Sequence, residues 1–448
     1  MTGLKNVLLV QNARNHSGFH VSRSHVTNSL TKTGLSLIYG FRTRKSVLVL
    51  VQIQKYLIMK RINYIIGLGV FACTVGAIYG CNSKPGNDNR IALTTKYVTE
   101  KPTKQYVKLA LLLDTSNSMD GLINQAKSQL WDIVNEFTYA RCGNQVRPEL
   151  QIALYEYGND NLSSKEGYIR QVLGFSNDLD EISEKLFSLT TNGGEEYCGT
   201  VIHTSLKQLD WGKNADDLKM IFIAGNEPFT QGKLSYKDAA LNAKEKDVIV
   251  NTIFCGNYQQ GISTKWKNGA ILTGGEYMAI DHNQQIVHIE TPYDDVIIKL
   301  NTKLNNTYIS YGSLGATKAA AQATQDSEAY SMNKGVAVKR SISKSSRLYK
   351  NSKWDLVDAV EEDKVELEKI KEEDLPKALQ GKTEKEMRAY IESKKQERLS
   401  IQKQIKALNA KREAYIAKSQ KQQVGELENA LLNAIKNQAA KKNYRWDK

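Results

Sequence analysis

The sequence predicts an α/β fold, a doubly wound and mostly parallel sheet, followed by a C-terminal helical region for which a coiled coil is one alternative. Two observations favour the sheet. Near-continuous apolar runs of strand length recur through the middle of the chain, and amphipathic stretches of helix length separate them. Such alternation is typical of parallel strands that helices cover on both faces. The third observation is a stripe at roughly seven-residue spacing near the C-terminal end, which indicates long helices and includes charged members: Met387, Ile391, Arg398, Ile405, Leu408, Arg412 and Tyr415.

The predicted elements follow one another in a regular order. Apolar runs predict strands at residues 106–113, 149–157, 169–175, 220–224, 248–254 and 277–280. Amphipathic spacing predicts helices at residues 122–137, 180–189, 201–209, 236–245 and 294–304. Ligands of such sheets bind beyond the carboxyl ends of the strands. The loop after the first strand is therefore where we expect the functional site.

Charge is distributed unevenly along the chain. The 448 residues include 62 Lys and Arg and 48 Asp and Glu, for a net charge of +14. Ten of the basic residues and no acidic residue lie in 1–80, so residues 81–448 carry 52 basic against 48 acidic side chains, or +4. The excess of positive charge belongs to a segment of targeting type. We therefore expect no nucleic-acid partner.

The N-terminal segment is typical of an export signal. Met59-Lys60-Arg61 precedes the apolar stretch 62–78, and Cys81 follows at a polar boundary. Residues 78–81 resemble a bacterial lipobox, which predicts a signal peptide at 59–80, lipidation of Cys81 and a linker at 81–105. A retained membrane helix is the alternative. Both interpretations predict a protein of the cell membrane or outer membrane that faces the periplasm or the surface, and residues 1–58 are interpreted as a non-native extension or a presequence.

Three cysteines follow the export signal. Cys142 and Cys198 flank loop-like stretches, so a disulfide between them is a hypothesis for an oxidising compartment. Cys255 ends a predicted buried strand and is expected to be a small core residue. The sequence has no CxxC spacing, so a zinc site of that type is not expected.

The loop after the first predicted strand carries a candidate metal site. Asp114, Ser116 and Ser118 alternate in the run Asp-Thr-Ser-Asn-Ser, which can direct three oxygens toward one point. Mg2+ prefers such oxygen ligands, is held by few carboxylates and keeps open positions. The same residues also suit the N-cap of the next helix without any metal. The motif alone therefore leaves both a metal site and a helix N-cap open.

Residues 108–311 look like a von Willebrand factor type A domain, which we delimit at 106–312, and the motif matches the DxSxS part of its metal-ion-dependent adhesion site. The resemblance implies bound Mg2+, or Mn2+ or Ca2+. It also implies a threonine from a second loop, for which Thr200 is the best match, with Glu195 and Glu196 as further candidates. In the family a later strand ends in an Asp, where this chain has Gly225, and Glu227 or Asn226 is the expected substitute.

Two classes of function follow from this resemblance. The first is a membrane-anchored binding module whose divalent metal takes a carboxylate from a protein partner. The alternative is a metal-independent scaffold of the cell envelope that acts through its C-terminal helices. An enzyme is not expected, because no catalytic triad, phosphate loop or paired catalytic carboxylates are evident.

The C-terminal third is expected to be separate from the sheet. Residues 313–353 are interpreted as a linker or a partly ordered connection, because an Ala-rich helical start at 316–323 is followed by Ser, Lys and Arg without clear periodicity. Residues 354–448 are predicted to form a helical hairpin or coiled coil, with Gly425 at the turn. The basic end, which includes Tyr444 and Trp446, is expected to be a free polar tail, and the oligomeric state is not predicted.

Overall fold

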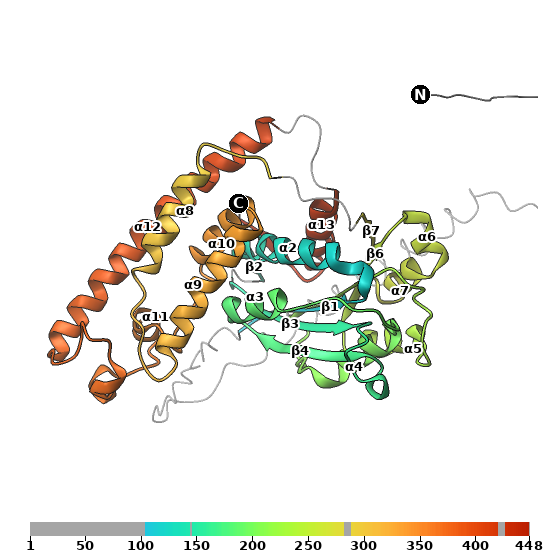
Figure 1. The fold of residues 1–448 in the computed structure, drawn as a ribbon, viewed down its shortest axis with the longest axis horizontal. Coiled ribbons are helices and arrows are strands. Elements are labelled where there is room, and N and C mark those ends of the chain that lie inside the picture. Colours follow the sequence, from blue (N-terminus) through green and yellow to red (C-terminus); the bar gives the residue numbers. More distant parts are fainter. Residues whose placement is uncertain (1–103, 144–145, 282–287, 420–425, 448) are drawn as a thin grey trace, which may run out of the picture. The chain divides into compact units, whose positions relative to one another are not determined.

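The computed structural model describes residues 104–143, 146–281, 288–419 and 426–447 (Figure 1). Its main sheet has six strands in the order β4-β3-β1-β5-β6-β7. Only β4 runs antiparallel to its neighbour, so the predicted mostly parallel sheet is confirmed. The strands are β1 (Tyr106–Asp114), β3 (Glu149–Tyr157), β4 (Ile169–Ser176), β5 (Leu218–Gly225), β6 (Ile249–Cys255) and β7 (Tyr277–Ile280).

The central strand β1 explains why the apolar runs are continuous. Leu111 pairs with Leu154 of β3 on one side and with Phe222 of β5 on the other. Its odd-numbered neighbours Val107 and Leu109 join one buried cluster, whereas Ala110 and Leu112 join a second cluster on the opposite face. Because both faces are covered, a strand here cannot alternate apolar and polar side chains.

Helices cover the two faces. The first cluster contains side chains of α2 (Asp120–Thr138), α3 (Leu179–Phe187) and α13 (Glu426–Ala440). The second contains side chains of α4 (Cys198–Gln208), α5 (Tyr236–Glu245) and α7 (Trp266–Thr273). The short helix α6 (Tyr258–Ser263) follows β6. The sequence predicted these elements except for α6, α7 and the place of α13.

The segment 313–353, which we expected to be a linker, is instead two packed helices. α9 (Gly315–Met332) and α10 (Lys334–Lys344) contact each other, and α10 also packs on α2. Half of the residues that these two helices bury are polar or charged, which weakens the apolar periodicity of the sequence. Arg340 and Lys344 of α10 are 1% and 0% exposed and form ion pairs with Asp180 of α3 and Asp326 of α9.

The long helix α12 (Glu384–Ser419) packs within its own chain. It contacts α8 (Asp294–Asn305), α10 and α11 (Leu356–Glu361). The charged members of the seven-residue stripe are also buried: Arg398 pairs with Asp355 and Asp358, and Arg412 pairs with Asp294. The stripe therefore faces this chain's own helices.

The C-terminal end returns to the sheet domain. α13 contacts α2 and β7, whereas α12 contacts α8, α10 and α11, so the expected hairpin between the last two helices is not formed. Residue Gly425 lies outside the described residues. The strand β8 (Tyr444–Trp446) pairs antiparallel with β2 (Ala140–Cys142), and Tyr444 is 4% exposed. The expected free tail was therefore wrong.

The three described cysteines are free and buried. Cys142 belongs to the first apolar cluster and Cys198 to the second, so the sheet lies between them and the hypothesised disulfide is wrong. Cys255 is a core residue, as expected. Cys81 and the predicted export signal lie outside the described residues, among which no helix is long and apolar enough to cross a membrane.

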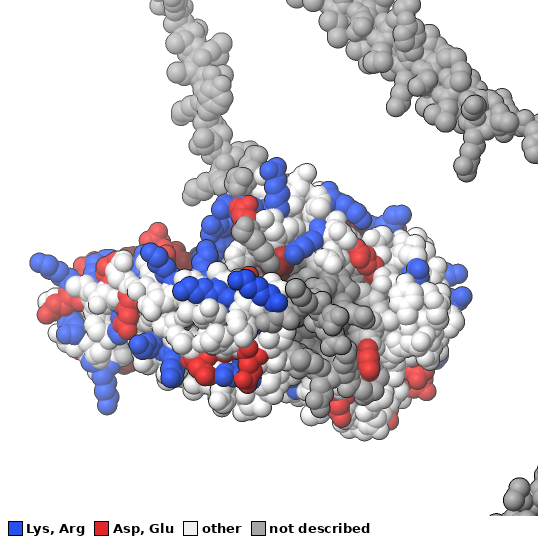
Figure 2. Space-filling view, turned by 90° about the horizontal axis from the view of Figure 1, so that it is seen from above, with Lys and Arg blue, Asp and Glu red and all other residues white. Residues whose placement is uncertain are grey.

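Charged side chains of both signs are interspersed on the face seen in Figure 2. Lys and Arg alternate there with Asp and Glu over the helical part of the chain, at the left of the view. This mixture is typical of a solvated helical surface.

Candidate metal centre

The candidate site begins at the carboxyl end of β1. Asp114 is the last residue of the strand and is 0% exposed. Its Oδ1 accepts a hydrogen bond of 2.8 Å from the backbone N–H of Ser116. A short 3-10 turn, Asn117–Met119, then leads into α2. Neither Ser116 nor Met119 makes a side-chain cap, so the N-cap interpretation of the motif does not describe this structure.

Glu196 lies beside Asp114. The two carboxyl groups flank Gly158, where an added Cβ would lie 2.8 Å from Glu196 Cγ and 2.9 Å from Asp114 Oδ1. Glu196 is 3% exposed, and its Oε2 accepts a 3.3 Å hydrogen bond from the backbone N–H of Glu227. The second loop therefore brings a carboxylate to the first.

The end of β5 supplies an amide in place of a carboxylate. An added Cβ at Gly225 would lie 2.5 Å from Tyr157 Oη and 3.1 Å from Asp114 Oδ2, so no side chain fits there without displacement. Asn226 follows, and its Nδ2 donates a 3.1 Å hydrogen bond to Ser118 Oγ. The side chain of Asn226 thus faces the DxSxS loop beside the position where the family has its Asp.

The side chains of three other candidates are not placed against this group by any hydrogen bond among the described residues. Thr200 is in the first turn of α4, and its methyl carbon lies 3.5 Å from a Cβ built on Gly167. Glu195 is exposed and accepts a 3.2 Å hydrogen bond from Gln231 Nε2. The side chain of Glu227 is exposed as well. Their roles as metal ligands stay predictions.

The two buried carboxyl groups have shifted pKa values. Burial raises the pKa of Asp114 well above its ordinary value, and the adjoining Glu196 carboxyl raises it further. Burial also raises the pKa of Glu196. Burial is the main cause of both shifts, because a charge held away from water is unfavourable, whereas a hydrogen bond with Asp114 acts against the rise at Glu196. A cation between the two groups would favour their charged forms.

Three buried oxygens of the site have no hydrogen-bond partner among the described residues. They are Asp114 Oδ2, Ser116 Oγ and Asn226 Oδ1. Buried polar atoms without partners are uncommon in folded proteins, and a site that takes an ion commonly contains them. Together with Glu196 they form a set of carboxylate, hydroxyl and amide oxygens, which is the donor chemistry that Mg2+ or Mn2+ prefers. The residues present therefore fit a hard divalent cation.

This site holds fewer carboxylates than a site built from acidic side chains alone. Across the part of the chain that the structure describes, no group of three or more His, Cys, Asp or Glu could hold a metal. A bound ion would depend on hydroxyl and amide oxygens as well. Sequence reasoning missed Gly158, whose φ of +78° and lack of a Cβ let the two carboxyl groups approach.

The metal-free protein should become more stable as the pH falls from 7 toward 5. The folded-state pKa values of Asp114 and Glu196 are raised, so in this range the folded chain binds more protons than the unfolded chain and acidification favours folding. The expected slope is up to about 1.4 kcal/mol per pH unit for each proton bound. Urea unfolding in EDTA would measure it.

The control is Glu196→Gln, in which one charge of the pair is absent. Its stability should change less with pH than that of the wild type between pH 5 and 7, while distant groups such as His288 contribute equally to both. Parallel curves for the two proteins would contradict the assignment of the coupled pair.

The fold and this oxygen cluster define an α/β domain with a metal-type site at the carboxyl edge of its sheet. The family model for the von Willebrand factor type A domain matches residues 108–262, about a third of the chain. The chain therefore contains a von Willebrand factor type A domain, as its motif predicted.

Solved structures with a similar fold include proximal thread matrix protein 1 from the mussel byssus, at 13% identity and a TM-score of 0.30, over 40% of this chain and 42% of that one. A form of the mussel protein described with a zinc-occupied MIDAS motif has 14% identity and a TM-score of 0.31, over 40% and 43%. BatB from Bacteroides thetaiotaomicron has 15% identity and a TM-score of 0.30, over 39% and 90%. This chain thus spans less than half of the mussel protein. No curated protein matches.

Proposed function

We propose that this protein is a membrane-anchored, non-enzymatic binding module that engages a carboxylate of a protein partner through a divalent metal at the Asp114 site. The observation that carries the proposal is the set of buried oxygens without partners among the described residues, Asp114 Oδ2, Ser116 Oγ and Asn226 Oδ1, beside the carboxyl group of Glu196. A hard divalent cation bound there would offer an open position to an oxygen ligand.

Each residue has a distinct part in this proposal. Asp114 and Glu196 supply the negative charge that attracts the cation. Ser116 contributes a neutral oxygen, and the hydrogen bond from Asn226 holds Ser118 in place. Asp114 is fixed by the backbone of Ser116, so its free oxygen keeps one direction. Such preorganisation lowers the cost of ordering the ligands when the ion binds.

The charge of the surrounding loops makes binding of a partner's carboxylate depend on the metal. Four segments meet at the site, and they contain six Asp and Glu but no Lys, Arg or His: residues 114–120, 158–161, 190–200 and 225–231. Without a cation, an approaching carboxylate meets only like charge. A metal ion would provide the attraction that the protein's own side chains do not. Binding of an acidic partner should therefore vanish in EDTA.

The described chain enters the sheet at the edge opposite the site. The chain enters β1 at Tyr106 and reaches the metal site at Asp114, the last of the strand's nine residues. A strand of this length spans about 30 Å. If Cys81 carries lipid, the linker 81–105 would join the amino edge of the sheet while the metal site lies at the carboxyl edge.

The test is thermal unfolding of the full chain in EDTA, Mg2+ or Mn2+. A cation that binds only the folded state stabilises it by about 2.7 kcal/mol at a hundredfold excess over its dissociation constant. We expect Mg2+ or Mn2+ to raise the melting temperature of the wild type and of Asp238→Asn, an exposed control on α5, but not of Asp114→Asn. Identical melting in EDTA and metal would sink the proposal and favour the metal-independent scaffold.

The partner's chemistry has a separate test. With Mn2+ present, a peptide that carries a single Asp should bind the full chain, and its Asn counterpart should not. Equal binding of the two peptides, or binding that persists in EDTA, would show that the metal does not receive a carboxylate.

A further inference from the structure

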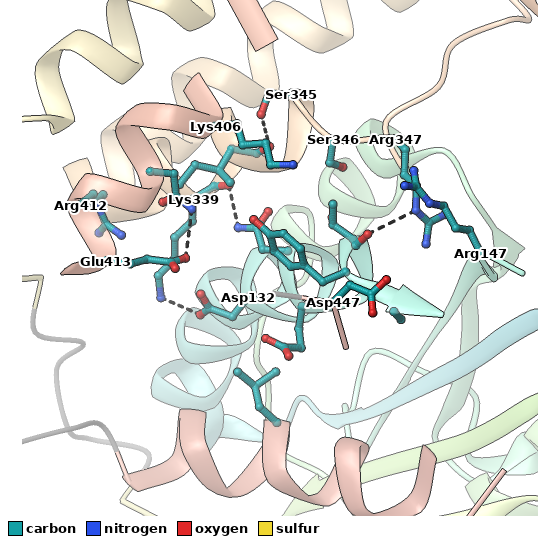
Figure 3. A pocket seen from close by; sticks show the side chains of 18 of the residues that line it. Asp132, Arg147, Lys339, Ser345, Ser346, Arg347, Lys406, Arg412, Glu413 and Asp447 are labelled. Atoms are coloured by element: carbon teal, nitrogen blue, oxygen red, sulfur yellow. Dashed lines mark hydrogen bonds and ion pairs between the residues drawn. The ribbon is translucent and has the colours of Figure 1, made fainter. Parts of the chain in front are cut away.

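A second cavity lies far from the metal site. It has a volume of about 570 Å3 and is bounded by the C-terminal half of α2, by α10 and α12, and by the β2–β8 ribbon (Figure 3). Cavities of this size are typical of small-molecule sites. The part of α2 before its first lining residue, Asp132, separates the cavity from the DxSxS loop by about 18 Å. The cavity is therefore independent of the proposed metal function.

Arg347 fixes the basic end of this cavity. Its guanidinium donates three hydrogen bonds to backbone carbonyls, of Thr138 (3.3 Å), Pro148 (3.0 Å) and Phe137 (3.2 Å). An arginine has five N–H donors, so two remain available. The hydrogen bonds hold the charge in one place at the end of α2, so it does not need to be ordered when a ligand binds.

Like charges gather around Arg347. Burial together with the neighbouring Arg147 and Arg141 lowers the pKa of Arg347 to about 10. Figure 3 shows the side chains of Arg147 and Arg347 next to each other at one end of the cavity. Asp447 forms an ion pair with Arg141. Glu149 also acts on Arg347 but pairs with Lys104, so three guanidinium groups and a lysine accompany two carboxylates, an arrangement that an anion would stabilise.

Two cations on the lining have no partner among the described residues. Arg147 and Lys406 are exposed and make no hydrogen bond or ion pair with a described side chain, and Lys406 extends toward Ser346 in Figure 3. Lys339 and Arg412 are instead paired with Asp132 and Asp294. Two further acidic residues line the cavity: Glu136 is 4% exposed and pairs with Lys436, and Glu413 lies at the other end near Lys339 (Figure 3). The basic end therefore carries uncompensated positive charge.

We propose that this cavity binds a phosphate-bearing organic ligand, with the phosphate held by Arg147, Arg347 and Lys406. Arginine forks match the oxygens of a phosphate group, and a dianion balances the excess charge better than a single carboxylate does. Ile342, Ile416 and Leu432 line the same cavity and offer apolar contact to the rest of the ligand. The phosphate could belong to a soluble molecule or to a lipid headgroup.

Calorimetric titration of the full chain at constant ionic strength tests the proposal. The probes are inorganic pyrophosphate, inorganic phosphate, acetate, and vesicles of phosphatidylglycerol or of phosphatidylcholine. We expect pyrophosphate or phosphatidylglycerol to bind and acetate and phosphatidylcholine not to. Binding of pyrophosphate would identify a soluble phosphate as the source, and binding of the anionic vesicles alone would identify a lipid headgroup.

The variants form a matched set. Lys406→Gln and Arg147→Gln should each weaken binding roughly tenfold, the size of one charge-assisted hydrogen bond. Lys411→Gln changes an exposed lysine of the same helix that does not line the cavity, so its affinity should stay within about twofold of the wild type. Equal effects of Lys406→Gln and Lys411→Gln would overturn the proposal. So would the failure of both pyrophosphate and phosphatidylglycerol to bind at about 10 mM.

Discussion

Replacing Arg340 with methionine is expected to lower the free energy of unfolding by about 3 to 5 kcal/mol. The guanidinium is 1% exposed and pairs at 2.7 Å with Asp180 and with Asp326. It also lies over the ring of Trp131, 5.0 Å from the ring centroid. Without Arg340, Lys344 would be the remaining cation for two buried carboxylates. Urea unfolding of the full chain would measure the loss.

The exposed Arg388 provides the control. It forms an i,i+4 ion pair with Glu384 on α12, a type worth at most about 0.5 kcal/mol, so Arg388→Met should cost little. A double variant separates the loss of charge pairing in Arg340→Met from the loss of packing. Asp180→Asn added to Arg340→Met removes one uncompensated carboxylate and should restore part of the stability. A cost below about 1 kcal/mol for Arg340→Met would mean that α9 and α10 do not depend on this cluster.

The pH dependence of this variant has a definite sign. The pKa of Asp326 is lowered to about 2, mainly by Lys344 and Arg340 acting against burial. A lowered carboxyl pKa contributes stability above the unfolded value of about 3.9, and this contribution is lost as the pH falls toward 2. Arg340→Met removes part of it. The difference between wild type and variant should therefore shrink as the pH falls from about 4 to about 2.

The same cluster explains where sequence reasoning failed. Strands and helices such as Tyr236–Glu245 and Tyr277–Ile280 were predicted with the bounds that the structure has, because apolar periodicity reports burial in an apolar core. α9 and α10 instead bury Arg340, Lys344 and glutamines against other polar groups. Burial by ion pairing leaves no apolar period in the sequence, so the segment looked like a linker.

The sequence predicted one part of the site better than the other. The DxSxS motif identified Asp114, because it is local and follows a clear strand. The second loop was harder, since α4 begins at Cys198 and not at Val201 as the apolar pattern indicated. This shift of three residues puts Thr200 inside the helix, while Glu196 remains in the loop beside Asp114. Helix bounds are the least certain part of such predictions.

Restoring the family's aspartate at Gly225 is expected to destabilise the metal-free protein. The new Cβ would lie 2.5 Å from Tyr157 Oη, on a fully buried ring whose hydroxyl donates a 2.8 Å hydrogen bond to the carbonyl of Ala224. Overpacking of this kind costs about 1 to 3 kcal/mol, and Gly225→Ala should show that part alone. The carboxylate of Gly225→Asp adds a third negative charge to the buried pair, which should cost several kcal/mol more in EDTA.

Measuring the stability of both variants with and without Mg2+ distinguishes a purely steric effect of Gly225→Asp from an effect of its charge on the metal site. If the Asp114 oxygens bind a cation, saturating Mg2+ should narrow the stability gap between Gly225→Asp and Gly225→Ala, because the ion offsets the added charge. If they do not, the gap should be the same in EDTA and in Mg2+. Since Glu196 already provides a second carboxylate beside Asp114, we expect Gly225→Asp to bind Mg2+ more tightly than the wild type but to fold less stably without it. In this chain the two buried carboxylates of the site come from the end of β1 and from the loop before α4, where the absence of a side chain at Gly158 gives Glu196 room.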